Sequence, residues 1–364
     1  MSTIEPLVDQ TTPTTAAMHR KGTGALESSV DDLLGEARTF ITPALRASVA
    51  ALPYNIRLVA SYHFGWTNPD GSRLAAEGSW GKGLRPALVL ACARAVGGDA
   101  SMAVPAAAAV ELVHQASIIQ DDVIDHDAVR RHRPAVWTVY GIPAAVLVAD
   151  ALFFASIRAL LGGSPQHTVA ATETFIDDVQ CLVAGELTDT HFETRRKVSL
   201  AACWTMTAAK TGALMESACA LGARLGNATP QRIREMGRFG HSLGMAFQAV
   251  DDYLGIWGTG LTGKPVLADL KRRKKSLPVA YAMATQTTAS AELAAVYGKD
   301  GQLTDREAEL AAALIEQTGA RAWVITQARA KVATALDHLA AARPTADGLD
   351  QLTAIARIIT DRQA

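Results

Sequence analysis

Cysteine is scarce in this chain of 364 residues, and so is net charge. The four cysteines form no CxxC pair and lie in apolar, helix-like segments. This pattern excludes a zinc ribbon and a disulfide framework, and it predicts reduced core cysteines in a cytoplasmic protein. Lys and Arg number 35 against 36 Asp and Glu, a net charge of −1. The chain therefore lacks the basic excess of most nucleic-acid-binding proteins, and we expect no nucleic-acid partner.

Long apolar runs are missing as well. Residues 1–28 are polar, rich in Thr and without periodicity, which predicts a disordered tail and no signal peptide. The longest apolar stretch, Ile142–Ile157, carries Asp150 and is too short to cross a bilayer. We therefore expect a buried core helix there and no membrane span.

The alternation that marks β-strands is also absent. From Ser29 onward, Ala and Leu dominate with helical periodicity, and Gly and Pro fall between the periodic blocks. Thr229 followed by Pro230 has the composition of a helix start. The sequence thus predicts an all-α fold of roughly ten or more helices in a single domain over residues 29–364. The predicted turns are residues 68–71, 97–99, 162–165 and 227–230.

Two aspartate pairs interrupt strongly apolar sequence, and the first pair continues to a third aspartate. On a helix, Asp121 and Asp125 point the same way, and Asp122 lies next to that face. Clustered carboxylates repel one another unless a cation compensates. Mg²⁺ prefers such oxygen ligands and usually joins carboxylates to phosphate groups. The pattern predicts a metal site for a diphosphate; a solvated acidic turn is the alternative. The second pair is Asp251-Asp252.

Basic residues suited to phosphate oxygens accompany both pairs. Arginines follow the first pair at positions 130, 131 and 133, where a solvated basic patch is the alternative. Upstream, the segment Gly81–Pro86 places two cations beside a helix start, which is an anion-binding arrangement. His114 lies two helical turns before Asp121, although a lone His in an apolar helix is often a core residue. Lys210 stands within an apolar helix and needs a partner or a ligand.

In order and spacing, these elements resemble the trans-isoprenyl (polyprenyl) diphosphate synthases, from about Gly81 to Pro278. The resemblance implies a single-domain isoprenoid synthase-type helical bundle around a central cavity, usually a homodimer. It implies three Mg²⁺ ions between two carboxylate clusters and an allylic diphosphate. Two ions would bind Asp121, Asp122 and Asp125, and the third would bind Asp251.

The resemblance also implies roles for the other polar residues. The allylic diphosphate would contact the cations Arg130, Lys210, Lys264 and Lys274. Isopentenyl diphosphate would contact Lys82, Arg85, His114 and Arg131. Gln248 and Asp252 would support the second cluster. Thr211 and the Gly185/Asp189 cluster also fall at functional positions of the family. The chain departs from the family pattern at Trp80, Gly83 and Gly255, where the family usually has Gly, Arg and Asp.

The implied activity is Mg²⁺-dependent condensation of isopentenyl diphosphate with an allylic diphosphate. Ala116 and Ser117, just before Asp121, are small, and the family places bulky aromatics there when chain growth stops early. We therefore expect geranylgeranyl diphosphate as the product, and Ala116→Phe to shorten it. Phe153 and Phe154 are candidates for a deeper stop, with ordinary core packing as the alternative. The competing functions are a class I terpene cyclase, a prenyltransferase with a different acceptor, and a non-catalytic partner subunit.

Overall fold

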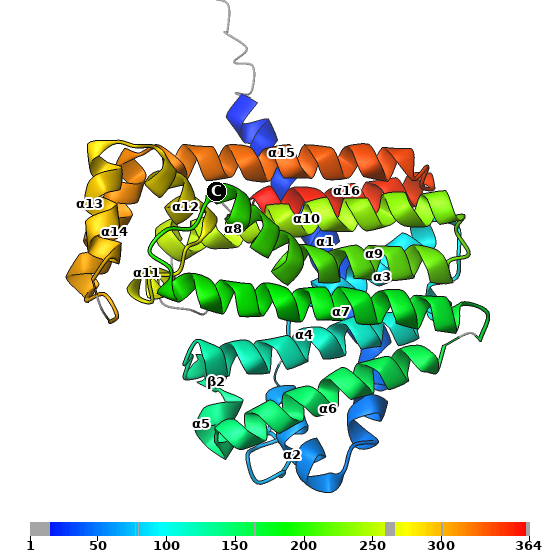
Figure 1. The fold of residues 1–364 in the computed structure, drawn as a ribbon. Helices are drawn as coiled ribbons and strands as arrows, with labels where there is room; N and C mark the ends of the chain where they lie inside the picture. Colours follow the sequence, from blue (N-terminus) through cyan, green and yellow to red (C-terminus); the bar gives the residue numbers. More distant parts are fainter. Residues whose placement is uncertain are drawn as a thin grey trace, which may run out of the picture.

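Helices make up nearly all of the regular structure. The computed structural model describes residues 15–361, apart from 77, 79, 164, 259–265 and 300. Sixteen α-helices form within this part of the chain, so the predicted all-α fold is confirmed (Figure 1). The α-helices are α1 (Thr15–Ala50), α2 (Tyr54–His63), α3 (Leu84–Ala95), α4 (Val104–Ile124), α5 (Val136–Tyr140), α6 (Ile142–Leu161), α7 (Pro165–Thr194), α8 (Leu200–Thr207), α9 (Ala213–Leu225), α10 (Pro230–Trp257), α11 (Ala268–Lys271), α12 (Leu277–Ala284), α13 (Thr288–Tyr297), α14 (Asp305–Gln317), α15 (Ala320–Ala341) and α16 (Ala346–Asp361).

Four short elements complete the described structure. A 3₁₀ turn, Ala100–Ala103, precedes α4, and a wide π-type turn, Ala208–Gly212, joins α8 to α9. Two strands of two residues each, β1 (Val129–Arg130) and β2 (Arg133–Pro134), pair as an antiparallel hairpin. The sequence did not predict this hairpin, because two-residue strands leave no periodic pattern.

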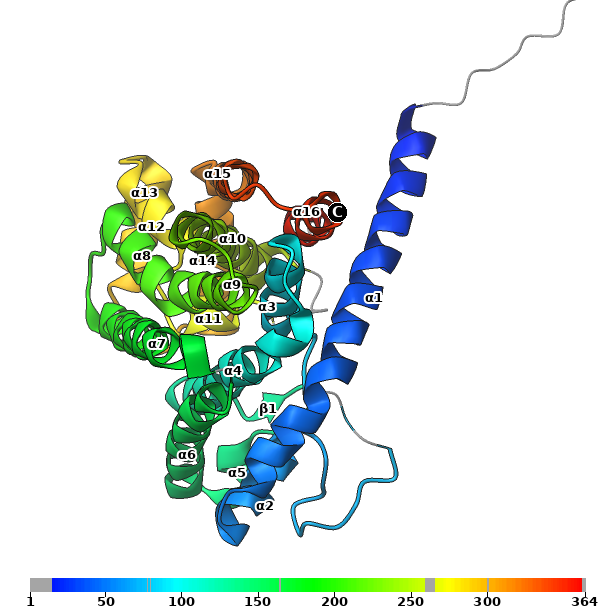
Figure 2. The ribbon, with the colours of Figure 1, turned by 90° about the vertical axis from the view of Figure 1, so that its right-hand side faces the viewer.

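The core lies between long helices that run side by side (Figures 1 and 2). The apolar side chains of α10 recur at Met236, Phe239, Leu243, Ala246 and Val250, which places them on one buried stripe. That stripe packs α10 between α9 and α15, while α4 packs against α6. Helix α4 is buried all round through its first half, as expected for a helix without a polar face. A smaller apolar cluster lies among α11–α14 at one end of the molecule (Figure 1).

The predicted turns and the predicted helix start are confirmed where the structure describes them. Residues 68–71, 97–99, 162–163 and 227–229 all fall between helices. Thr229 is the N-cap of α10, and its hydroxyl accepts a hydrogen bond from the backbone N–H of Arg232, with Pro230 in the first turn. The composition of this junction therefore indicated its local structure correctly.

The N-terminal segment differs from the prediction. Helix α1 begins at Thr15, so residues 15–28 continue the helix where we expected an unstructured tail; residues 1–14 lie outside the described residues. Ala16, Ala17 and Leu26 are strong helix formers, and a helix can extend without an apolar stripe. Figure 2 shows α1 standing along one side of the bundle.

Two helical segments of the described chain are long and apolar enough to cross a bilayer by length and composition alone, Ala100–Ile124 and Ile142–Leu161. The second is 20 residues long, longer than the stretch that the sequence indicated. The most apolar windows of the two are 67% and 39% buried inside the molecule. Because α4 and α6 pack against each other, both are part of the bundle. The prediction of a buried core helix at Ile142–Ile157 is confirmed only in part, because Leu147 and Phe154 of α6 are 62% and 73% exposed.

Arg232 connects the ends of two helices. Its guanidinium donates hydrogen bonds to the carbonyl oxygens of Ala342 at 2.9 Å, Val96 at 3.2 Å and Arg343 at 3.0 Å. These carbonyls end α15 and α3 and have no partner within their own helices. We expect Arg232→Ala to lower the free energy of unfolding by about 2–4 kcal/mol. Denaturant unfolding would measure it. Arg232→Lys, which keeps the charge but not the fork of donors, should recover only part of the loss; an Ala variant as stable as wild type would contradict this.

Candidate active site

Aspartates of both motifs line one cavity of about 290 Å³. Asp121 reaches it from α4 and Asp125 from the C-cap of this helix, while Asp251 and Asp252 reach it from α10. Residues of α3, α7, α8, α9, α11 and the wide turn at Ala208–Gly212 also line it, together with Arg130 of β1 and the segment before α12. The predicted interior cavity thus brings together carboxylates that are far apart in the sequence.

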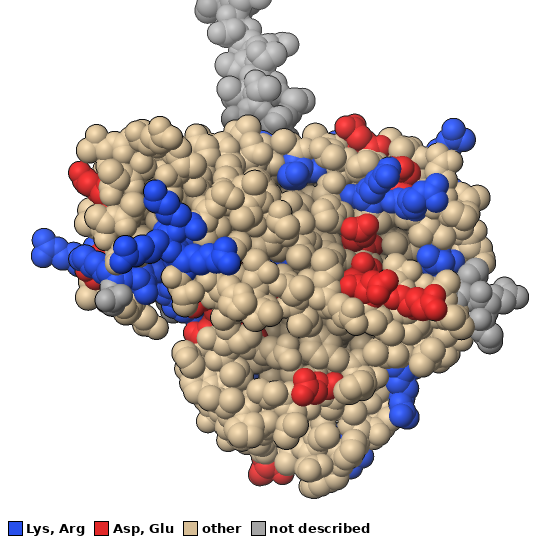
Figure 3. All heavy atoms as spheres, in the orientation of Figure 1, with Lys and Arg blue, Asp and Glu red and all other residues tan. Residues whose placement is uncertain are grey.

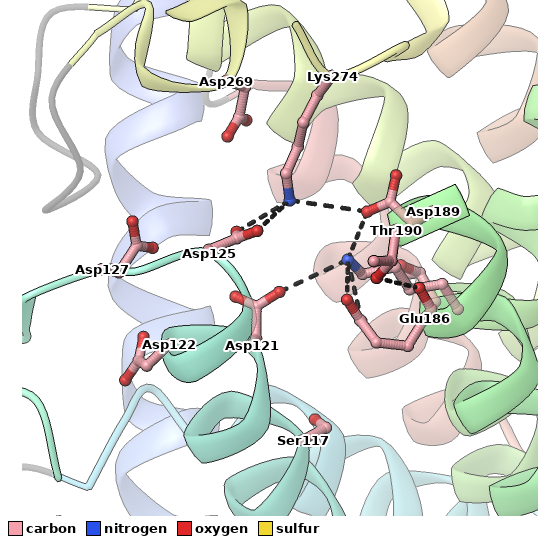
Figure 4. Close-up of polar contacts among 12 residues, drawn as sticks. Ser117, Asp121, Asp122, Asp125, Asp127, Glu186, Asp189, Thr190, Asp269 and Lys274 are labelled. Atoms are coloured by element: carbon pink, nitrogen blue, oxygen red, sulfur yellow. Dashed lines mark hydrogen bonds and ion pairs between the residues drawn. The ribbon is translucent and has the colours of Figure 1, made fainter. Parts of the chain in front are cut away.

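Two lysines face Asp121 and Asp125, and one of them, Lys274, is labelled in Figure 4. The Nζ of Lys210 lies 3.5 Å from Oδ1 of Asp121, and the Nζ of Lys274 lies 2.8 Å from Oδ1 of Asp125. Asp189 of α7 contacts both cations, at 2.8 Å from Lys210 and 3.7 Å from Lys274. The cavity is therefore lined by alternating charges, and its lysines stand where they could bind the oxygens of a diphosphate.

Lys210 stays protonated although it is buried. Burial alone lowers its pKa, but the negative charges of Asp189, Asp121 and Glu186 raise the pKa well above its usual value. Burial and the charge of Lys210 lower the pKa of Lys274, and the charges of Asp189, Asp125 and Asp121 reverse this, so that the pKa of Lys274 is also raised. Both side chains thus remain cations over the whole physiological pH range.

Gly185 explains how α7 comes so close to Lys210. A Cβ atom at this position would lie 2.3 Å from the backbone nitrogen of Lys210, a distance that no side chain tolerates. The glycine therefore lets α7 pack directly against the wide turn, with Glu186 and Asp189 aimed at the Lys210 ammonium. The Gly185/Asp189 cluster predicted from the sequence is therefore the place where α7 packs against the backbone of Lys210 and pairs its carboxylates with the Lys210 ammonium.

Asp122 is placed differently from the prediction. It is 1% exposed, is not among the described residues that line the cavity, and accepts a hydrogen bond from Nε of Arg130 at 2.8 Å. Burial raises the pKa of Asp122 to about 6, against the opposing effect of Arg130. A residue next to Asp121 is turned by roughly 100° around the helix, so it leaves the face that Asp121 and Asp125 share (Figure 4).

Carboxylate oxygens of Asp121, Asp122 and Asp127 lie within 4.8 Å of one another and could hold a metal ion by distance alone. The guanidinium of Arg130 already lies among them, 3.5 Å from Asp121 and 3.5 Å from Asp127. We therefore interpret these three carboxylates as ion-pair partners of Arg130. For Mg²⁺, Asp121, Asp125 and Asp251 fit better, because they line the cavity. Asp125 is ion-paired with Lys274 and Arg272, so a metal ion would have to share its oxygens with these cations.

The two aspartates of the second pair make different contacts. Asp252 accepts hydrogen bonds on both oxygens, from Nε2 of Gln248 at 2.8 Å and from the backbone N–H of Leu277 at 2.8 Å. The Thr211 hydroxyl donates to Gln248 at 2.7 Å and extends the chain of bonds. Burial raises the pKa of Asp252 to about 7, and the two hydrogen bonds oppose that rise. Asp252 thus ties α10 to the start of α12, and Asp251 faces the cavity.

Arg85 and His114 line another part of the cavity wall. Nη1 of Arg85 donates to Nε2 of His114 at 3.0 Å, and both residues line the cavity. Burial and the charge of Arg85 hold the pKa of His114 well below its usual value, so the imidazole is neutral. Lys82 is exposed, just before the helix that carries Arg85.

A buried glutamine that the sequence did not single out organises the neighbouring segments. Gln115 donates from Nε2 to the carbonyl of Trp80 at 3.1 Å and accepts from Nη2 of Arg131 at 3.2 Å. Arg131 and His132, at the tip of the β1–β2 hairpin, have left-handed backbone angles of φ 52° and 61°, which few non-glycine residues adopt. The bond to Gln115 helps to hold Arg131 in this conformation, beside Gly81.

Trp80 and Gly83, two departures from the family pattern, are neighbours in the structure. Gly83 has φ +72°, and a Cβ there would lie 2.9 Å from Cγ of Arg38 and 3.4 Å from the ring of Trp80. Trp80 is 4% exposed and fills the space beside the turn. The missing arginine at position 83 therefore follows from a tighter turn that a buried aromatic ring supports.

The remaining predicted residues take several positions. Ser117 lines the cavity one turn below Asp121 (Figure 4), whereas Ala116 is fully buried in the core. Phe154 is 73% exposed, which contradicts a role as the deep stop within one chain, and Phe153 packs partly buried against the core.

Arg133 donates to the carbonyls of Tyr62 and Thr67, each at 2.9 Å, so its role is structural. Lys264 lies outside the described residues.

The comparisons with known proteins agree with this geometry. The polyprenyl synthetase family model matches residues 75–314. The chain is 41% identical over 341 residues to a (2E,6E)-farnesyl diphosphate synthase of Mycobacterium tuberculosis, covering 91% of this chain and 93% of the relative. It is 43% identical over 290 residues to a geranylgeranyl diphosphate synthase of the same species, covering 79% and 82%.

A solved structure gives the same result for the fold. The polyprenyl synthetase from Streptomyces coelicolor A3(2) has a TM-score of 0.85 to this chain at 40% identity, covering 91% of this chain and 99% of that one. The residues that the family model matches include all the described residues that line the cavity. The chain therefore belongs to the polyprenyl synthetase family and is a trans-prenyl diphosphate synthase, a transferase.

Proposed function

We propose that this enzyme elongates prenyl chains by condensing isopentenyl diphosphate with an allylic diphosphate, and that its main product is geranylgeranyl diphosphate. The observation that carries the proposal is the presence of two cationic groups on one cavity. Lys210 and Lys274 lie among the carboxylates, and Arg85 lies with neutral His114 on another part of the wall. Two separate cationic groups suit two diphosphates, one for the donor and one for the acceptor.

The residues of the chain would divide the chemistry between them. Lys210 and Lys274 would hold the allylic diphosphate as its C–O bond breaks, and Arg85 would hold the acceptor so that its double bond attacks the allylic carbon. The proton that the new product must lose would pass to the departing diphosphate. Leu182, Met206 and Leu214 line the cavity and would keep water from the allylic cation.

The family is Mg²⁺-dependent, and the acidic residues here fit that metal. Three Mg²⁺ ions per site are part of the proposal: Asp121 and Asp125 would hold two, and Asp251 would hold the third. When bound, the metal neutralises the charge that develops on the leaving diphosphate.

The product length in this proposal depends on the wall below Asp121. Ser117 and Ile118 line the cavity there and present no aromatic ring. The named relatives include both a farnesyl and a geranylgeranyl diphosphate synthase, so similarity alone does not choose between them. A small residue at position 117 favours the longer of the two products.

We further propose a homodimer in the cytoplasm. Large apolar side chains are exposed along α6 and α7, among them Leu147 at 62%, Phe154 at 73% and Leu187 at 57%. Figure 3 shows that much of this face carries neither Lys, Arg, Asp nor Glu. Association of two copies through this face would bury the apolar residues.

A single assay tests the proposed function. The purified chain with Mg²⁺, isopentenyl diphosphate and geranyl or farnesyl diphosphate should give geranylgeranyl diphosphate, which is identified by mass after phosphatase treatment. EDTA should abolish turnover. Incubation with geranylgeranyl diphosphate alone is the matched control. A hydrocarbon from that incubation, without elongation in the first, would show a class I terpene cyclase instead, and inactivity of the pure chain would indicate a partner subunit.

A further inference from the structure

The wide turn Ala208–Gly212 carries two residues of the cavity wall, Lys210 and Thr211. Its hydrogen bonds span one residue more than those of an α-helix, an arrangement that is rare, is usually limited to one turn and is frequent at functional sites. An ordinary helix over the same residues would be tighter, and a shift of one residue turns a side chain by roughly 100° about the helix axis. The direction in which Lys210 points therefore depends on what keeps this turn wide.

Two glycines of neighbouring helices lie against the turn. Gly185 of α7 faces the backbone nitrogen of Lys210, and Gly244 of α10 approaches another part of the turn, where a Cβ atom would lie 3.0 Å from Cα of Gly212. Helix α9 also contacts the turn. Glycines permit this close approach, but they have no side chain that could hold the turn in one form.

One side chain of α10 does pack against the turn. A Cβ atom on Gly212 would lie 3.2 Å from both Cε1 and Nδ1 of His241, so the imidazole ring lies directly against this residue. Nδ1 of His241 lies 3.0 Å from Oε2 of Glu216, which follows Gly212 by one helical turn on α9. His241 is not among the described residues that line the cavity. The ring therefore joins the turn, α9 and α10 from outside the cavity.

We propose that His241 is a positioning residue, whose ring keeps the wide turn in the form that presents Lys210 to the cavity. Glu216 holds the ring in place. The side chains of His241 and Glu216 are 36% and 42% exposed, so their pairing should contribute little to global stability. The effect should appear instead in the binding of the group that Lys210 contacts. The inference rests on the proposed function for the identity of that group as the allylic diphosphate.

The kinetics of His241→Ala give the first test. This variant should raise KM for the allylic diphosphate and lower kcat, each by about tenfold, and leave KM for isopentenyl diphosphate within about twofold of wild type. His241→Gln should recover most of the loss, because its amide can lie against Gly212 and donate to Glu216. Isotopically labelled isopentenyl diphosphate makes slow variants measurable.

A double-mutant cycle separates positioning of Lys210 from a general structural effect. In a Lys210→Gln background the cation is already absent, so His241→Ala should change kcat and the allylic KM by less than about twofold. Equal losses in the two backgrounds would overturn the proposal, and so would wild-type kinetics in the single His241→Ala variant.

A second pair of His and Glu on α10 supplies the matched control. Nδ1 of His338, on α15, lies 2.8 Å from Oε2 of Glu235, and neither residue is among the described residues that line the cavity. His338→Ala should leave kcat and both KM values within about twofold of wild type. A loss as large as that of His241→Ala would show a general effect and overturn the proposal. Circular dichroism and thermal unfolding should show that every variant is folded.

Hydrogen exchange tests the turn without any substrate. Deuterium uptake over residues 206–214 should rise in His241→Ala, while uptake over residues 230–236 should stay as in wild type. Unchanged uptake over residues 206–214 would overturn the proposal. A chain that shows the rise but elongates no primer would keep the role of His241 in the turn and lose the proposed reaction. A chain that elongates primers with no effect of the side chain at position 241 would do the reverse.

Discussion

Asp121→Asn and Asp125→Asn should each lower kcat by about 10³-fold, with a much smaller change in protein stability. Both carboxylates face the cavity, where they oppose Lys210 and Lys274 and are placed to hold divalent cations. Loss of either charge removes a proposed metal ligand and also leaves a lysine with fewer negative neighbours. Steady-state kinetics at saturating Mg²⁺, with both substrates varied, would measure the effect.

Asp122→Asn is the matched comparison, because the sequence alone assigns the same role to all three aspartates. In the structure, Asp122 is buried against Arg130 and does not face the cavity. We therefore expect a smaller loss in kcat, on the order of tenfold, through a less firmly held Arg130. Equal losses in the three variants would show that Asp122 is a ligand after all and that the Arg130 pairing gives way when the metal binds.

Ser117→Phe should shift the product from geranylgeranyl diphosphate to a chain shorter by at least one isoprene unit. Ser117 lies on the cavity wall one turn below Asp121, so an aromatic ring there would occupy the space into which the growing chain extends. The products after phosphatase treatment, separated and sized by mass spectrometry, give the answer. Farnesol in place of geranylgeraniol is the expected result, and an unchanged product distribution would refute the assignment of this wall.

Ala116→Phe serves as the control for that variant. The sequence favours both positions equally, but Ala116 is fully buried in the core and not among the described cavity residues. A ring at position 116 should therefore destabilise the fold by about 1–3 kcal/mol through overpacking. Shortened products from this variant, without a loss of stability, would return the chain-length role to Ala116.

The sequence predicted the structural features that depend on neighbouring residues, namely helices, turns and helix caps. Helical periodicity and the Gly and Pro positions indicated the all-α fold and its turns, and the Thr229-Pro230 junction was correct because capping involves neighbouring residues. The spacing of Asp121 and Asp125 placed both on one face for the same reason. Membership of the family also follows from the order of these motifs.

Contacts between distant segments could not be predicted in this way. Asp269 and Gly255 become neighbours only because the chain returns through Leu267, and Gly185 matters only because α7 meets the backbone of Lys210. Gln115 lies in a largely apolar helix, and its partners include His63, Trp80 and Arg131, which come from three other parts of the chain. The exposure of Phe154 likewise depends on which face of α6 packs against α4.

The pairing of Lys210 and Lys274 with carboxylates has a consequence for how the site fills. Each of these cations is already paired with carboxylates of the chain, so a lone phosphate must displace an internal ion pair in order to bind either lysine. A diphosphate and its metal ions that arrive together can exchange partners with these internal ion pairs at little net electrostatic cost. We therefore expect the diphosphate to bind more strongly together with its metal ions than alone.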